Sequence, residues 1–234
     1  MKKSASRKEV TSPSEGTALD RTIVRLRTDI VTGLLAPDSK LRLDDLKVRY
    51  GVSGSPLREA LSRLAGSGFV LAEPQRGFCV PGASREDLLD ITMIRQLIEA
   101  KALALSMEYG DEVWEGELVA AFHRFKQRTE RGCHMETETL PLWEEAHKDF
   151  HMALISACGS DRLIELQEDL YDQALRYRRM LVEYKFNAVD LIAEHTELMN
   201  AILSGDQALA IEELTRHLSL TADLVNSVIS KDIE

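Results

Sequence analysis

The 234-residue sequence lacks any apolar run that approaches the ~20 residues of a membrane-spanning helix. Its basic N-terminus, MKKSASRKEVTSPSEG, is not followed by the apolar core of a secretory signal. Cysteine is scarce as well, and Cys79, Cys133 and Cys158 are widely spaced without a C-x-x-C pair. These absences predict a cytoplasmic protein with reduced thiols.

Positive charge is also in short supply. The chain has 29 Lys and Arg against 39 Asp and Glu, a net charge of −10, which on average disfavours binding to nucleic acid phosphates. At 44% hydrophobic and 29% charged residues the composition is that of a globular protein, and the length suits one large domain or two ordinary ones.

The charge is distributed unevenly along the chain. Residues 1–82 hold 14 Lys and Arg against 9 Asp and Glu, a net of +5, whereas residues 83–234 have 15 against 30, a net of −15. This asymmetry predicts two domains with different partners. The alternative is a chance excess in the polar tail of residues 1–20, which contributes Lys2, Lys3, Arg7 and Lys8.

Residues 21–82 have the pattern of a small helical domain with a hairpin. One helix is predicted within 19–35, a second from Leu43 to Gly51, and a third over LREALSRLAGSG, with Ser55 as N-cap and Pro56 in the first helical position. The segment FVLAEPQRGFCVP then reads as strand, turn and strand. This order predicts a winged helix-turn-helix.

The run LKVRYGVSGSPLREALSRLAGSGFVLAEPQRGFCV resembles the DNA-binding domain of GntR-type bacterial transcription regulators. The resemblance implies that Arg58, with help from Arg63, reaches DNA from the third helix. It also implies that Arg76 and Gly77 form the tip of the wing. We further expect Ser53 and Ser55 to contact phosphates, so that these six residues bind DNA.

Surface ion pairing is the alternative for both arginines of the third helix. Arg58 has Glu59 and Glu73 as candidate partners, and for Arg63 a surface role and a DNA-binding role are about equally expected.

Residues 83–234 predict an all-helical bundle. Helical segments are expected at about 84–109, 111–131, 139–158, 160–185, 188–204 and 206–230, separated mainly by glycines. The fold class is therefore mainly α, with an N-terminal winged helix-turn-helix and a C-terminal helical domain.

Four of the six histidines are predicted to meet inside this bundle. His147 and His151 are spaced i, i+4 on one helix, so both can face one metal ion. His195 and His217 lie on the last two helices, each about eleven residues from the turn at Gly205, so an antiparallel hairpin brings them level. The alternative is that these are surface residues. His123 and His134 fit no pattern and are expected at the surface.

The segments EEAHKDFHMALISACGS and EHTELMNAILSGDQALAIEELTRHL resemble the FCD (FadR-like) effector domain of one large GntR subfamily. In many members an Asp and three His bind a divalent metal, and His151, His195 and His217 match the three His positions. His147 stands at the Asp position. Since a neutral nitrogen replaces an anionic oxygen, we expect Zn²⁺ or Ni²⁺ rather than Mn²⁺.

An anionic effector is expected above this metal. Arg95 resembles the family's R-x-x-(L/I)-E arginine that often faces the pocket, although an ion pair with Glu99 is an equal alternative. Arg176 or Tyr177 of QALRYRRML is the candidate second contact, against a solvated charged face. The local sequence also resembles CsiR-type repressors, which respond to a short dicarboxylate such as glutarate.

The sequence therefore predicts a non-enzymatic, ligand-responsive regulator, most simply a repressor that binds a palindromic operator as a homodimer and is released by a small carboxylate. A metal-dependent hydrolase using the four histidines is the alternative from another class. It is disfavoured because H-K-D-F-H lacks the helix-borne glutamate of H-E-x-x-H. A purely structural zinc site is a third possibility.

Overall fold

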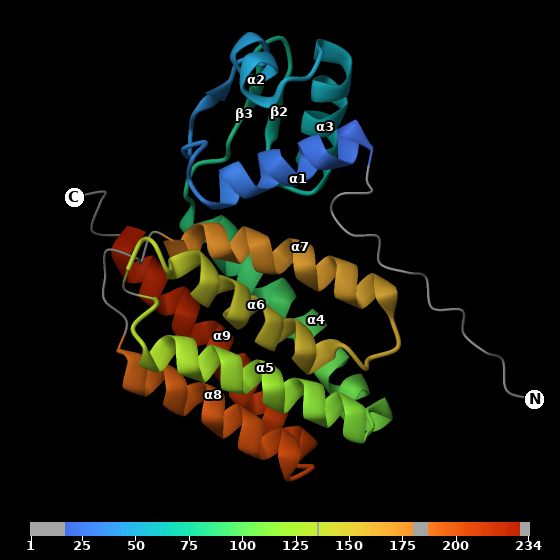
Figure 1. The fold of residues 1–234 in the computed structure, drawn as a ribbon, viewed down its shortest axis with the longest axis vertical. Helices are drawn as coiled ribbons and strands as arrows, with labels where there is room; N and C mark the ends of the chain where they lie inside the picture. Colours follow the sequence, from blue (N-terminus) through green and yellow to red (C-terminus); the bar gives the residue numbers. More distant parts are fainter. Residues whose placement is uncertain (1–16, 135, 180–186, 230–234) are drawn as a thin grey trace, which may run out of the picture. The chain divides into compact units, whose positions relative to one another are not determined.

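The computed structural model describes residues 17–134, 136–179 and 187–229 (Figure 1). The chain divides into two compact units, Met1–Gly82 and Ala83–Glu234. Both are mainly helical, and a small antiparallel sheet lies in the first, which confirms the predicted fold class. The greater part of the predicted polar tail, residues 1–16, lies outside the described residues.

The first unit contains three helices and a three-stranded sheet. Its elements are α1 (Ala18–Val31), β1 (Lys40–Leu41), α2 (Leu43–Tyr50), α3 (Gly54–Gly66), β2 (Leu71–Glu73) and β3 (Gly77–Cys79). The sheet order is β1-β3-β2, and both pairings are antiparallel. The predicted wing corresponds to β2 and β3, whereas the two-residue strand β1 was not predicted because it is too short to show alternation.

Two helix starts differ from the prediction. α1 begins at Ala18, inside the segment assigned to the tail, because Thr17 and Asp20 form a capping box. α3 begins at Gly54 with Ser53 rather than Ser55 at the N-cap, since the Leu57 amide already bonds to the Ser53 carbonyl. Pro56 is tolerated in this first turn because its missing N–H would have no helical partner there.

A compact apolar core holds the helix-turn-helix together. α1 packs on α3, and the turn after α2 is made at Gly51, whose φ of 67° is a left-handed conformation that suits glycine. The largest fully buried side chains of this core are Leu26, Ile30, Leu57, Leu61 and Phe69.

The second unit is a bundle of six helices within the described residues. They are α4 (Arg85–Tyr109), α5 (Glu112–Glu130), α6 (Leu140–Ile155), α7 (Asp161–Arg178), α8 (Ala188–Leu203) and α9 (Gln207–Ile229). Each corresponds to one predicted segment. α6 ends three residues earlier than predicted, and residues 180–185 of the predicted fourth segment lie outside the described part.

The bundle is arranged so that α6 lies between α5 and α7, while α4 packs against α7 and α9 (Figure 1). α8 and α9 form the expected antiparallel hairpin, and α5 covers both α6 and α8. Phe125 of α5 and Phe150 of α6 are fully buried and stack with centroids 6.1 Å apart. This aromatic layer lies directly beside the histidines described below.

No helix among the described residues is long and apolar enough to cross a membrane.

We expect Leu118→Ala to destabilise the helical bundle by about 2–5 kcal/mol, because Leu118 is fully buried and its loss leaves a cavity. The neighbouring Val119 is 43% exposed, so Val119→Ala should change stability by only about 0.5 kcal/mol. Urea unfolding followed by tryptophan fluorescence measures both variants, since both tryptophans, Trp114 and Trp143, lie in this unit. Equal effects of the two substitutions would contradict the packing described here.

Candidate metal centre and DNA-binding surface

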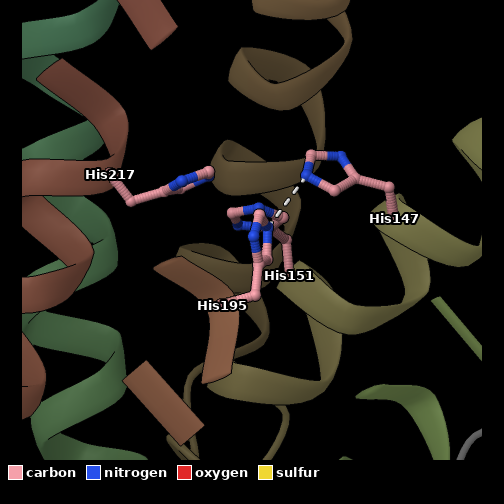
Figure 2. A group of neighbouring side chains, drawn as sticks. All are labelled: His147, His151, His195 and His217. Atoms are coloured by element: carbon pink, nitrogen blue, oxygen red, sulfur yellow. Dashed lines mark hydrogen bonds between the residues drawn. The ribbon is translucent and has the colours of Figure 1, made fainter. Parts of the chain in front are cut away.

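The structure brings the four predicted histidines to one point in the helical unit (Figure 2). His147 and His151 project from α6, His195 from α8 and His217 from α9. One ring nitrogen from each lies within 4.8 Å of the others, and the four residues are at most 5% exposed. The i, i+4 spacing and the symmetric hairpin therefore place these residues as the sequence suggested. We call this group the histidine tetrad.

Burial keeps the tetrad neutral. Removal from water lowers the pKa of each of the four imidazoles well below 6.5, and the positive charges of neighbouring residues act in the same direction. The neutral imidazole, with a free lone pair, is the form that binds metal ions. The tetrad therefore needs no deprotonation to act as a set of ligands near pH 7.

The outer nitrogen of each ring faces an oxygen atom. His195 Nδ1 lies 2.7 Å from the Leu191 carbonyl oxygen, and His147 Nδ1 lies 2.7 Å from the Tyr171 hydroxyl. His217 Nδ1 lies 3.2 Å from a Glu194 carboxylate oxygen, and His151 Nδ1 lies 3.6 Å from one of Glu99. Such oxygens orient metal-binding imidazoles, which then present Nε2 to the ion.

The geometry of the tetrad fits a divalent metal ion. His147 and His195 place their Nε2 atoms 3.2 Å apart (Figure 2). Ligand bonds of about 2.0–2.1 Å to zinc put the nitrogens of a tetrahedral site about 3.3 Å apart. Four neutral nitrogen donors suit zinc or nickel better than manganese or magnesium.

Two buried arginines give one side of the tetrad a positive charge. The Arg95 and Arg178 guanidinium carbons lie 5.5 and 4.5 Å from the centroid of the Tyr171 ring. Arg95 also pairs with Glu99 at 2.7 Å, so both predicted roles of Arg95, a buried ion pair and a place beside the metal site, are compatible. Gln167, one turn before Tyr171 on the same face of α7, is fully buried.

Several polar atoms of this region have no hydrogen-bond partner among the described residues. They are Arg95 Nη2, Glu99 Oε2, Arg178 Nε and Nη2, both amide atoms of Gln167 and both ring nitrogens of His151. Buried donors and acceptors without partners cost free energy, so a polar ligand or ordered water is expected to satisfy them.

The other two predicted effector contacts lie elsewhere. The Tyr177 hydroxyl donates to Asp87 Oδ2 at 2.5 Å and accepts from the Ser84 amide, and Arg176 pairs with Asp87 at 3.5 Å. Arg176 and Tyr177 thus hold the first turn of α4, while Arg178 of the same α7 turn is the arginine beside the tetrad. The sequence pattern RYRR does not reveal which arginine faces inward.

The two remaining histidines differ. His123 is exposed, as predicted. The prediction for His134 was wrong: it is 5% exposed and its ring lies 6.0 Å from that of Trp143. The loop between α5 and α6 folds back on the bundle, which a spacing argument does not detect.

The first unit presents a groove of about 570 Å³ between α3 and the wing. Arg58, Arg76 and Gly77 line it, and Gly77 has a φ of 96° at the start of β3. Arg58 is exposed and makes no ion pair with any residue that the structure describes, so neither proposed glutamate partner holds it. Arg63, by contrast, pairs with Glu59 at 2.8 Å.

The serines at the start of α3, Ser53 and Ser55, are exposed, and neither caps the helix with its side chain. Their hydroxyls are therefore available to a partner.

Two residues beside the tetrad, Tyr171 and Glu194, were not predicted, because no spacing rule links them to the histidines.

Family models match both units. The model for bacterial regulatory proteins of the gntR family matches residues 19–80, and the FCD domain model matches residues 90–220. The chain is 38% identical over 207 residues to the HTH-type transcriptional regulator BphR of Paraburkholderia xenovorans, covering 88% of this chain and 84% of BphR. It is 32% identical to the HTH-type transcriptional repressor GlaR of Escherichia coli, covering 88% and 94%.

Solved structures show the same fold. E. coli McbR/YncC superposes with a TM-score of 0.75 at 22% identity, covering 91% of this chain and 98% of that one. A GntR regulator from Rhodococcus sp. RHA1 superposes with a TM-score of 0.71 at 21% identity, covering 89% and 97%.

We expect His195→Ala to abolish stoichiometric zinc binding, because it removes a central nitrogen of the tetrad. His123→Ala is the matched control, since His123 is an exposed histidine of the same unit. Metal content after zinc loading and gel filtration, measured by mass spectrometry, tests both. Full zinc content in the His195 variant would contradict the assignment of the tetrad.

Proposed function

We propose that this chain, which belongs to the GntR family of bacterial regulatory proteins and carries an FCD domain, is a repressor released from its operator by a small carboxylate that binds beside a metal ion. DNA binding and regulation of transcription follow from the family. Repression is supported by two relatives, GlaR and RspR of E. coli, which are named as transcriptional repressors. The observation that carries the effector proposal is the pair of buried arginines with unpartnered donors next to the histidine tetrad.

In this proposal, the protein contacts DNA through the residues around the groove between α3 and the wing. Arg58 reads base edges from α3, because an unpaired guanidinium can bind guanine through two hydrogen bonds. Arg76 and Gly77 at the wing approach the adjacent groove, and Ser53 and Ser55 bind phosphates. Arg63 plays a lesser part because Glu59 already holds it. A homodimer would place two such units on the half-sites of a palindromic operator.

The metal in this proposal is zinc or nickel, held by His147, His151, His195 and His217. Such an ion supplies a Lewis-acidic position for a carboxylate oxygen. The protein supplies charge around it: Glu99 and Glu194 compensate part of the ion's charge, while Arg95 and Arg178 restore positive charge on the side of Tyr171. An anion is the ligand that balances this site.

The ligand therefore carries at least one carboxylate directed at Arg95 and Arg178. Two guanidinium groups with free N–H donors match carboxylate oxygens in geometry and charge. Hydrogen bonds to such a ligand would also remove the free-energy penalty of burying these N–H donors without a partner. A dicarboxylate has a second group to share between the arginines and the metal.

A physical connection leads from this site to the start of the helical unit. Arg178 faces the site, and its neighbour Tyr177 binds Ser84, the N-cap of α4, together with Asp87. Ser84 follows the boundary at Gly82, so the segment 81–84 is the proposed hinge. A ligand that shifts the last turn of α7 would bias this hinge and lower operator affinity by a coupling of ~1–3 kcal/mol.

The hydrolase alternative gains no support from the site. The carboxylates nearest the tetrad, Glu99 and Glu194, face the outer Nδ1 atoms of His151 and His217, and Glu99 is also paired with Arg95. A general base must instead reach a water molecule on the metal side of the ligands.

We expect Arg58→Ala to weaken operator binding by about 5- to 150-fold, the value of one bidentate base contact of ~1–3 kcal/mol. Arg63→Ala, on the same helix, is the control and should cost less than Arg58→Ala. Fluorescence anisotropy with a duplex selected by this protein from a randomised pool measures both. An Arg58 variant that binds as tightly as the parent would refute the assignment of the reading residue.

We expect Arg178→Gln and Tyr177→Phe to fail in different ways. The probe is the short-chain mono- or dicarboxylate that most raises the melting temperature of the zinc-loaded protein. Arg178→Gln should lose this thermal shift because it removes the anion contact. Tyr177→Phe should keep it but lose most of the ligand-induced drop in operator affinity, because the hydroxyl that holds Ser84 and Asp87 is gone. Normal release by the Tyr177 variant would exclude this route of coupling.

A further inference from the structure

Among the described groups that face the outer nitrogens of the tetrad, the Tyr171 hydroxyl is the one that both donates and accepts hydrogen bonds. Its hydroxyl lies 2.7 Å from His147 Nδ1, and its side chain is fully buried. The Leu191 carbonyl and the Glu194 carboxylate, which face His195 and His217, are acceptors, and His151 Nδ1, 3.6 Å from a Glu99 oxygen, makes no hydrogen bond among the described residues. The arginines stacked over its ring, Arg95 and Arg178, fix the position of the phenol.

The contacts of His195 determine the tautomer of its neighbour. His195 Nδ1 lies 2.7 Å from the Leu191 carbonyl oxygen, which can only accept, so Nδ1 carries the proton and Nε2 is a bare lone pair. His195 Nε2 lies 3.2 Å from His147 Nε2. For this contact to be a hydrogen bond without a metal ion, His147 must carry its proton on Nε2 and accept from the Tyr171 hydroxyl at Nδ1.

A metal ion requires the opposite tautomer of His147. Binding through Nε2 needs a lone pair there, so the proton must be on Nδ1, where it can be donated to the Tyr171 oxygen. The ring gives up one proton at Nε2 and takes one at Nδ1, so it stays neutral. Tyr171 keeps its own proton and only turns from donor to acceptor. A carbonyl at this place would serve one tautomer alone.

We propose that Tyr171 is a positioning residue that holds His147 through both tautomers, and thereby lets this imidazole act as a ligand that a divalent metal ion can engage and leave. The proposal rests on the metal site of the proposed function. It explains why the Tyr171 hydroxyl, rather than a carbonyl oxygen, faces Nδ1 of His147, the histidine whose Nε2 contacts His195. Phenylalanine at position 171 would keep the packing but leave His147 Nδ1 without a partner.

The test is the zinc affinity of the full-length chain with Tyr171→Phe, measured by competition with a chelator of known affinity. We expect a 10- to 100-fold loss, because a bound metal ion polarises the ring and makes its Nδ1–H bond to the Tyr171 oxygen stronger than the hydrogen bond that it replaces. In the His147→Ala background the same substitution should change the affinity less than about twofold, because the two residues act as one unit. An unchanged affinity, or an equal loss in both backgrounds, would overturn the proposal.

Nitrogen-15 NMR of the imidazoles gives a second readout that a purely structural role would not move. In the parent protein we expect His147 to carry its proton on Nε2 without metal and on Nδ1 with zinc. Observation of Nδ1 protonation in the metal-free parent would overturn the proposal even if the Tyr171 variant fails to fold. If the parent binds no zinc, the proposed metal function fails and this proposal fails with it, whereas zinc binding combined with Nδ1 protonation in the metal-free parent would overturn the tautomer proposal alone.

Discussion

The helical unit is built around one constraint: four imidazoles are buried together, so a ring nitrogen without a hydrogen-bond partner costs free energy. Charged imidazolium groups at this spacing would repel one another, and burial already disfavours the charge, which is why the pKa of each is lowered. Neutral rings leave one donor and one acceptor apiece. The oxygens of Leu191, Tyr171, Glu194 and Glu99 face the outer nitrogens, and the inner nitrogens are left facing one another. Only His147 and His195 come within hydrogen-bond distance of each other at Nε2, and His151 Nε2 has no partner among the described residues, so a cation at the centre would satisfy nitrogens that the tetrad alone does not.

The same constraint shapes the surroundings of the tetrad. Glu99 lies beside His151, and burying that carboxylate requires a counter-charge, which Arg95 supplies at 2.7 Å. Arg178 adds a second cation beside Tyr171 that makes no ion pair among the described residues, although its charge also acts on the carboxylate of Glu144. The proposed pairing of the tetrad with an anionic ligand would thus be a result of charge balance, and the helix that carries Arg178 also holds the first turn of α4 through Tyr177.

Much of the fold follows from the sequence because it depends on local rules. Glycines and caps punctuate the helices, and the i, i+4 spacing of His147 and His151 with the symmetric hairpin of His195 and His217 places four residues at one point. What was missed depends on packing between elements. β1 exists only because it pairs with β3, His134 is buried by a loop that folds back, and Arg178 rather than Arg176 faces inward because of how α7 is rotated against α4 and α6. No periodicity within one segment contains that information.

His147 shows how a change at one ligand is distributed over its neighbours. A carboxylate at this place would bring a negative charge to the metal, and it would have no ring proton whose position must change when the metal binds. A neutral imidazole can carry its proton on either nitrogen, so the Nδ1 of His147 needs a hydrogen-bond partner, which Tyr171 provides. The imidazole also brings no negative charge, so the charge that a carboxylate would supply must come from another group. Glu99 and Glu194 are too far outward to neutralise an ion fully, since each lies behind a histidine ring. In the proposed function, an anionic ligand that reaches both the ion and the unpartnered donors of Arg95 and Arg178 would complete the balance, so the affinity for that ligand would depend on whether the metal is present.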